Sequence, residues 1–145
     1  MTQLELQIEP DWRARLERAG LADLMTLLTA ELGREVQRKA GREVRYLTLP
    51  GPGPGLYLKR LAAPPTRAQL ADLARGKRAG RGEREARELA RVIRAGVRAS
   101  RPIAWGCVRR FGLAGEALLI TEQDRGASLP MALADAAPSC AGWAI

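Results

Sequence analysis

The chain has 145 residues, of which 46% are hydrophobic and 28% charged, so its size and composition are those of one globular domain. It carries 24 Lys and Arg against 16 Asp and Glu, a net charge of +8, and it contains no histidine. Without histidine, this chain alone cannot form a Ser-His-Asp triad, a Cys-His nucleophile or a His-containing zinc site. Its two cysteines, Cys107 and Cys140, lack CxxC spacing. No apolar run approaches the ~18 residues of a membrane span.

Arginine carries nearly all of the positive charge, with 21 Arg against 3 Lys. The arginines are spread from Arg13 to Arg125, which fits a GC-rich codon bias better than a single phosphate-binding face. A basic surface still attracts phosphates, nucleic acid and acidic lipid headgroups at long range. The first residues lack the basic and apolar regions of a secretory signal. We therefore expect a cytoplasmic protein, with a peripheral position at the inner membrane as an alternative.

The N-terminal part of the chain is predicted to be mainly helical. Pro10 and Asp11 precede spaced apolar residues that end at Gly20, a pattern typical of a short helix with a glycine stop. Apolar positions continue on one face to about Leu32. We assign residues 1–35 to an N-terminal helical and strand extension.

Two β-hairpins are predicted further along the chain. Residues 42–49 alternate polar and apolar positions, the Pro-Gly repeat at 50–55 forces a turn, and 56–61 resume as a strand. The second hairpin is expected from strands at 102–111 and 117–121, joined by a turn at 112–115.

One long helix lies between the two hairpins. Residues 62–82 form a connector with a weak helical piece around Leu70 and Leu73, and the spacing of apolar residues predicts a helix over 83–95 that Gly96 ends. The basic stretch that precedes this helix lacks the upstream glycine and the Ser/Thr of a P-loop, which favours a solvated loop. This order of elements predicts an α+β fold, an antiparallel β-sheet with one packed helix.

Two charged residues stand out by their placement. Lys59 lies in an otherwise apolar strand, and Glu85 lies near the start of the long helix, on the face that it shares with Leu89. A strand lysine that pairs with a helix glutamate keeps its charge and holds an ammonium where nucleotide phosphates arrive. The plainer interpretation is a lysine that extends to solvent and a glutamate favoured by the helix dipole.

A third feature supports the interpretation that this part of the chain binds a nucleotide. A strand with a buried pattern at 118–123 runs straight into the polar segment 123–126, as the last strand of a kinase small lobe runs into the hinge that meets adenine. Residues 40–129 resemble the small lobe of the lipopolysaccharide kinase (Kdo/WaaP, InaA-like) family. The resemblance is carried by Gly-Leu-Tyr-Leu-Lys-Arg at 55–60, Glu-Arg-Glu-Ala-Arg-Glu-Leu at 83–89, the segment 96–106, and Leu-Leu-Ile-Thr-Glu-Gln-Asp-Arg-Gly at 118–126.

The resemblance implies a role for each matching residue. Lys59 would contact the nucleotide phosphates and Glu85 would hold it; Thr121 would lie at the back of the adenine pocket, and Glu122 and Asp124 would offer main-chain hinge bonds. ATP with Mg would be the cofactor of the complete enzyme, and a sugar of the lipopolysaccharide core its acceptor. The glycine-rich GxGxxG loop is absent.

The second half of a kinase has no counterpart in this sequence. We assign residues 36–129 to the small lobe and residues 130–145 to an atypical tail, which leaves no catalytic-loop aspartate and no metal-binding aspartate. We therefore expect a truncated phosphotransferase that is inactive alone. Two alternatives remain open: a pseudokinase-like regulatory domain, or a basic module that binds an anionic membrane surface or nucleic acid. Nucleic acid is disfavoured because no aromatic residues alternate with basic ones to form a stacking platform.

Overall fold

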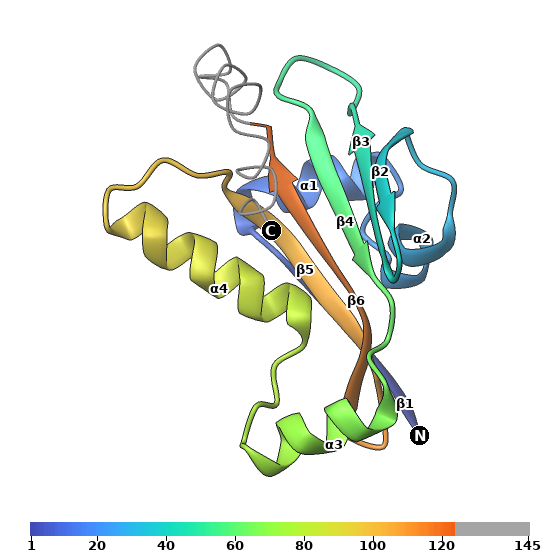
Figure 1. Ribbon diagram of the computed structural model, residues 1–145. Helices are drawn as coiled ribbons and strands as arrows, with labels where there is room; N and C mark the ends of the chain where they lie inside the picture. The colour runs from blue at the N-terminus through green and yellow to red at the C-terminus, as the bar shows by residue number, and fades with distance from the viewer. Residues whose placement is uncertain (124–145) are drawn as a thin grey trace.

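The strands all lie in one antiparallel sheet, with helices on both faces (Figure 1). The computed structural model describes residues 1–123. The sheet has six strands in the order β1-β5-β6-β4-β3-β2. The elements, in chain order, are β1 (Thr2–Ile8), α1 (Pro10–Arg18), α2 (Leu24–Thr29), β2 (Arg34–Lys39), β3 (Arg42–Leu47), β4 (Leu56–Leu61), α3 (Thr66–Ala74), α4 (Arg81–Arg94), β5 (Pro102–Arg110) and β6 (Leu113–Glu122).

Helices α1 and α2 cover one face of the sheet, which we call the core face. Strand residues such as Leu58 and Ile120, opposite each other in the β4–β6 register, are fully buried there. Trp12, Leu16 and Leu27 from the two helices belong to the same apolar cluster. Because alternate side chains of a strand point to opposite faces, the apolar positions of β4 and β6 divide between this core and the other side.

A polar network closes the edge of the core face. Glu43 on β3 accepts hydrogen bonds from Arg45, at 2.7 Å, and from Arg60, at 3.3 Å. Arg60 also donates to the carbonyl oxygen of Leu27 at 2.7 Å and to that of Ala30. Carbonyl groups at the end of α2 thus obtain partners from a strand, and this ties the helix to the sheet.

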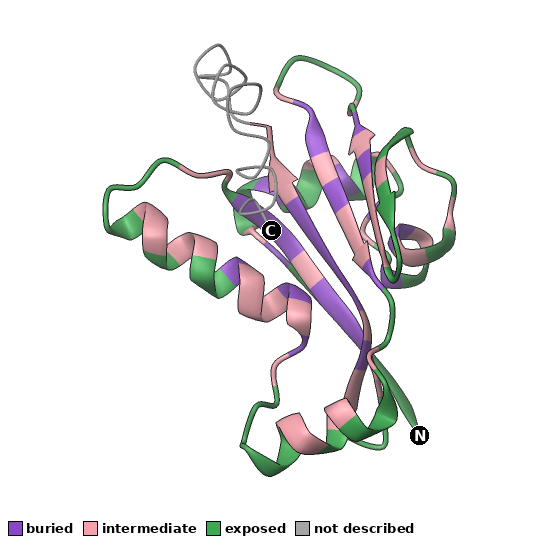
Figure 2. Ribbon diagram, viewed as in Figure 1, coloured by how far each residue is buried: buried purple, intermediate pink, exposed green. Residues whose placement is uncertain are grey.

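Helix α4 covers part of the opposite face, which we call the α4 face. It lies over β5 and β6 (Figure 1). Ala86 of this helix is buried. A Cβ atom on Gly82 would come within 2.0 Å of the carbonyl oxygen of Leu118, so only glycine allows the first turn of α4 to lie this close to β6. Figure 2 shows the buried residues along β4, β5 and β6, whereas the outer side of α4 is exposed.

The α+β class, both hairpins and the long helix are confirmed, with α4 at Arg81–Arg94 instead of 83–95. Strands β1 and β2 were not predicted. Within residues 1–123, α1 and α2 also pack against the sheet, in addition to the one packed helix that was expected. The turn expected at 112–115 is wrong, because Phe111 and Gly112, both with positive φ, make the reversal and β6 begins at Leu113. Among the described helices, none is both long and apolar enough to span a bilayer.

Candidate nucleotide-phosphate site

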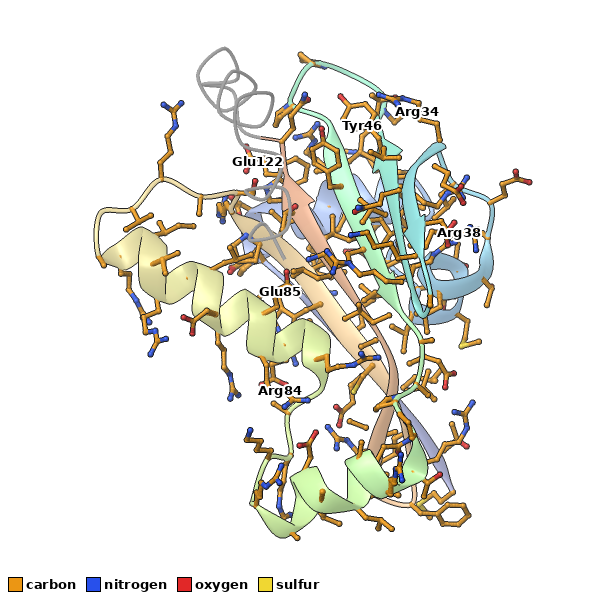
Figure 3. All side chains as sticks on the ribbon, in the orientation of Figure 1. Arg34, Arg38, Tyr46, Arg84, Glu85 and Glu122 are labelled. Carbon is orange, nitrogen blue, oxygen red and sulfur yellow. The ribbon has the colours of Figure 1, made fainter. Side chains whose placement is uncertain are left out.

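The central contact of the site is an ion pair between β4 and α4. The Nζ atom of Lys59 donates a hydrogen bond to Oε1 of Glu85. The Lys59 side chain is 12% exposed and that of Glu85 is 23% exposed, so the pair is largely shielded from solvent but still reachable. Glu85 extends from α4 toward the sheet in Figure 3. The pairing expected from the sequence is present in the structure.

Strand parity and helix packing together place this pair. Lys59 follows Leu58 on β4, so its side chain points away from the core face and onto the α4 face. Glu85 lies one turn after Gly82, the residue whose missing side chain lets α4 approach β6. Strand parity and close packing therefore bring an ammonium and a carboxylate together across 26 residues of chain.

Two aromatic residues lie beside Lys59 on the same face. Tyr57 is two residues before Lys59 on β4, and its ring meets that of Tyr46 edge-on, with centroids 5.2 Å apart and an interplanar angle of 60°. Thr121 pairs with Tyr57 in the β4–β6 register, so the residue expected at the back of an adenine pocket borders these rings. All three side chains are half-buried, which leaves apolar surface beside the charged pair.

The turn between β3 and β4 is fastened to the end of β6. The side-chain oxygen of Gln123 accepts a hydrogen bond from the Tyr46 hydroxyl at 2.9 Å and one from the Gly55 amide at 3.2 Å. A Cβ atom on Gly55 would lie 2.1 Å from the Tyr46 hydroxyl oxygen, so the last glycine of the Pro-Gly repeat makes room for that ring. Sequence reasoning missed Tyr46 and Gln123, although strand parity placed Tyr46 on the face of Val44.

The predicted hinge residues are only partly described. The backbone amide of Glu122 donates to the carbonyl oxygen of Arg101 at 2.8 Å, which ends β6 against the segment that precedes β5. Its carboxylate lies 4.0 Å from the Arg101 guanidinium. Asp124, the other expected hinge residue, lies outside the described residues, as does the proposed tail.

The structure adds Arg42 to the candidate residues. Arg42 follows the two-residue turn at Ala40 and Gly41, and strand parity places it on the face of Val44, the register partner of Lys59. Within residues 1–123 its Nε atom is buried and has no hydrogen-bond partner. A guanidinium donor without a partner, next to this two-residue turn, suits an anionic ligand. The alternation of polar and apolar residues in 42–49 could have indicated this position, because it places Arg42 and Tyr46 on the same face as Val44.

A magnesium site is not evident among these groups. Within the described part of the chain, no three His, Cys, Asp or Glu side chains gather closely enough to hold a metal ion. Glu85, the carboxylate nearest the expected phosphates, is already paired with Lys59. Magnesium binds through carboxylate and phosphate oxygens in a demanding octahedral geometry, so the described residues do not fit it.

Comparison with known proteins gives one structural match. No family model and no curated protein sequence matches the chain. The solved structure of WaaP in complex with acyl carrier protein is similar over 83% of this chain, with a TM-score of 0.50 and 19% sequence identity. The chain spans 41% of that WaaP chain. The fold of this chain is therefore similar to part of the WaaP fold.

Proposed function

We propose that this chain is the nucleotide-binding part of a kinase-like phosphotransferase of the lipopolysaccharide kinase type. The Lys59–Glu85 ion pair on the α4 face is the observation that supports this most strongly. An ion pair between a central strand and a helix packed on the sheet is how kinases hold a phosphate-binding lysine. In the complete enzyme the acceptor would be a sugar hydroxyl of the lipopolysaccharide core.

In this proposal the described residues bind and orient the nucleotide. The Lys59 ammonium would donate to phosphate oxygens while Glu85 holds it in position and preserves its charge. The unpartnered Nε of Arg42 would add a second donor in place of a glycine-rich loop. The adenine would lie against the rings of Tyr57 and Tyr46, beside Thr121.

Nucleotide binding by two matched lysine variants tests the proposal. We expect the full chain to bind ATP by isothermal titration calorimetry, and Lys59→Met to weaken that binding about tenfold or more, since a charge-assisted hydrogen bond to phosphate is lost. Lys39→Met removes the same charge from exposed β2 and should leave the affinity unchanged. Equal affinities for the two variants would refute the assignment of the site.

Phosphate transfer is a separate question from binding. We propose that the full chain binds ATP without transferring phosphate, because the residues above supply neither a base for the acceptor hydroxyl nor a metal site. The measurement is release of ADP in the presence of magnesium and a Kdo- or heptose-bearing acceptor. Release of ADP by the wild-type chain above the background without protein would contradict this proposal.

A further inference from the structure

A second basic site lies beside the first turn of α4, in a small pocket enclosed by α3, the start of α4 and the β5–β6 hairpin. Its enclosed volume is about 20 Å³, which is room for about one water-sized group, such as a single oxygen of a larger ligand. The charged side chains that line it are Asp72, Lys77, Arg78, Arg81, Arg84 and Arg109. The pocket thus holds five cations and one carboxylate.

Only part of this positive charge is neutralised by the protein. Arg84 extends from α4 toward α3 (Figure 3) and lies 3.3 Å from the Asp72 carboxylate, and Arg109 is paired with Glu5 at 3.0 Å. Within residues 1–123, no carboxylate forms an ion pair with any of the other three cations, which are Lys77, Arg78 and Arg81.

Two arginines of the pocket also hold buried donors without a partner. The Nε atoms of Arg81 and Arg84 are both buried, and neither has a hydrogen-bond partner in the described part of the chain. Burial, and then the positive charge of Arg84, lower the pKa of the Arg81 guanidinium. Buried donors without acceptors are costly, and so is the approach of two like charges, and an anion between them would relieve both.

We propose that this pocket binds the phosphate group of a phosphate monoester. Arginine guanidinium groups match phosphate oxygens in geometry, and two arginines with a free Nε–H, supported by Lys77 and Arg78, form a donor set of the required charge. Asp72 competes for Arg84, so the protein sets the affinity through this carboxylate.

The pocket is distinct from the nucleotide-phosphate site described above. Neither Lys59 nor Glu85 lines it, and neither does Thr121. Arg84 and Glu85 are neighbours on α4 whose side chains point in different directions, to α3 and to β4. The inference therefore does not depend on the proposed function, and phosphate should bind as well to Lys59→Met as to the wild type.

Three variants test the site, with inorganic phosphate as the probe and sodium chloride added to hold the ionic strength constant. Arg84→Gln should weaken phosphate binding about tenfold, measured by calorimetry, because one charge-assisted contact is lost. Arg87→Gln removes the same charge three residues further along α4, from an exposed side chain paired with Glu83, and should leave binding unchanged. Asp72→Asn should tighten binding severalfold, a change opposite in sign that no loss of folding can mimic.

Binding of three ligands distinguishes the possible sources of the phosphate group. Inorganic phosphate, a soluble sugar phosphate, and vesicles containing phosphatidic acid all present the same monoester group. Binding of the first two that depends on Arg84 supports a site for soluble ligands, and binding of the vesicles alone, with the same dependence, supports a lipid headgroup. Equal binding by Arg84→Gln and Arg87→Gln, or no binding of any of the three, would overturn the proposal.

Discussion

The two faces of the sheet differ in what fills them. On the core face, α1 and α2 bury fully enclosed leucine and isoleucine side chains, and Glu43 forms ion pairs there with Arg45 and Arg60. On the α4 face, the helix covers β5 and β6, while the charged and aromatic side chains of β3 and β4 stay half-buried. The alternation of side chains in β4 thus places Leu58 in the core and Lys59 in the proposed binding site, so stability and binding can be tested separately.

The largest expected effect is on stability, from a cavity in the core face. Leu58→Ala should lower the free energy of unfolding by about 3 kcal/mol, since a fully buried leucine is truncated in a closed core. The measurement is urea unfolding followed by circular dichroism. Leu70→Ala, on an exposed position of α3, is the control and should change it by less than ~0.5 kcal/mol.

A smaller loss of stability is expected from a substitution where α4 packs against the sheet. Gly82→Ala places a Cβ within 2.0 Å of the Leu118 carbonyl oxygen, so the start of α4 must shift away from β6, at a cost of about 2 kcal/mol. An alanine in place of a helical glycine otherwise stabilises a protein by roughly 0.5–1 kcal/mol, so the sign is diagnostic. Because Glu85 is one turn away, ATP affinity should fall as well. A more stable variant with unchanged ATP affinity would show that α4 does not depend on this close approach.

Disrupting the polar network of the core face should give the smallest loss of stability, and this loss should depend on pH. Burial alone raises the pKa of Glu43, but hydrogen bonds from Arg45 and Arg60 outweigh it, so the pKa in the folded state is below the usual 4.5. Its stabilisation is therefore complete above about pH 4.5 and is lost as the pH falls through the lower, folded-state pKa. Glu43→Gln should cost about 1 kcal/mol at pH 7, and the difference from the wild type should narrow below pH 4.5. A difference that stays constant from pH 7 to pH 3 would exclude this ionisation as the cause.

The strands and the helix that carry the candidate site could be predicted from the sequence, whereas the two edge strands of the sheet could not. Lys59 and Glu85 could be paired from the sequence because a lone lysine in an apolar strand and the periodicity of the next helix both point to one face. Strand β1 was missed although Leu4, Leu6 and Ile8 alternate with polar residues, since its burial depends on β5, about 100 residues away in the chain.

Strand β2 and the basic pocket could not be found by local patterns. Strand β2 is an exposed edge with an irregular register at Glu35 and Gln37, and such a strand has no apolar alternation to detect. The pocket combines residues of α3, α4 and the β5–β6 hairpin, and the local pattern shows only a basic stretch, which favours a solvated loop. Both features depend on tertiary contacts between distant segments.

The most direct test of the central claim uses the three lysines of the chain, Lys39, Lys59 and Lys77. Acylation by an amine-reactive ester, followed residue by residue with mass spectrometry, measures the accessibility of each ammonium in the same sample. If Lys59 receives the nucleotide phosphates, saturating ATP should slow its acylation severalfold while that of exposed Lys39 is unchanged. Acylation of Lys59 at the same rate with and without bound ATP would contradict the account.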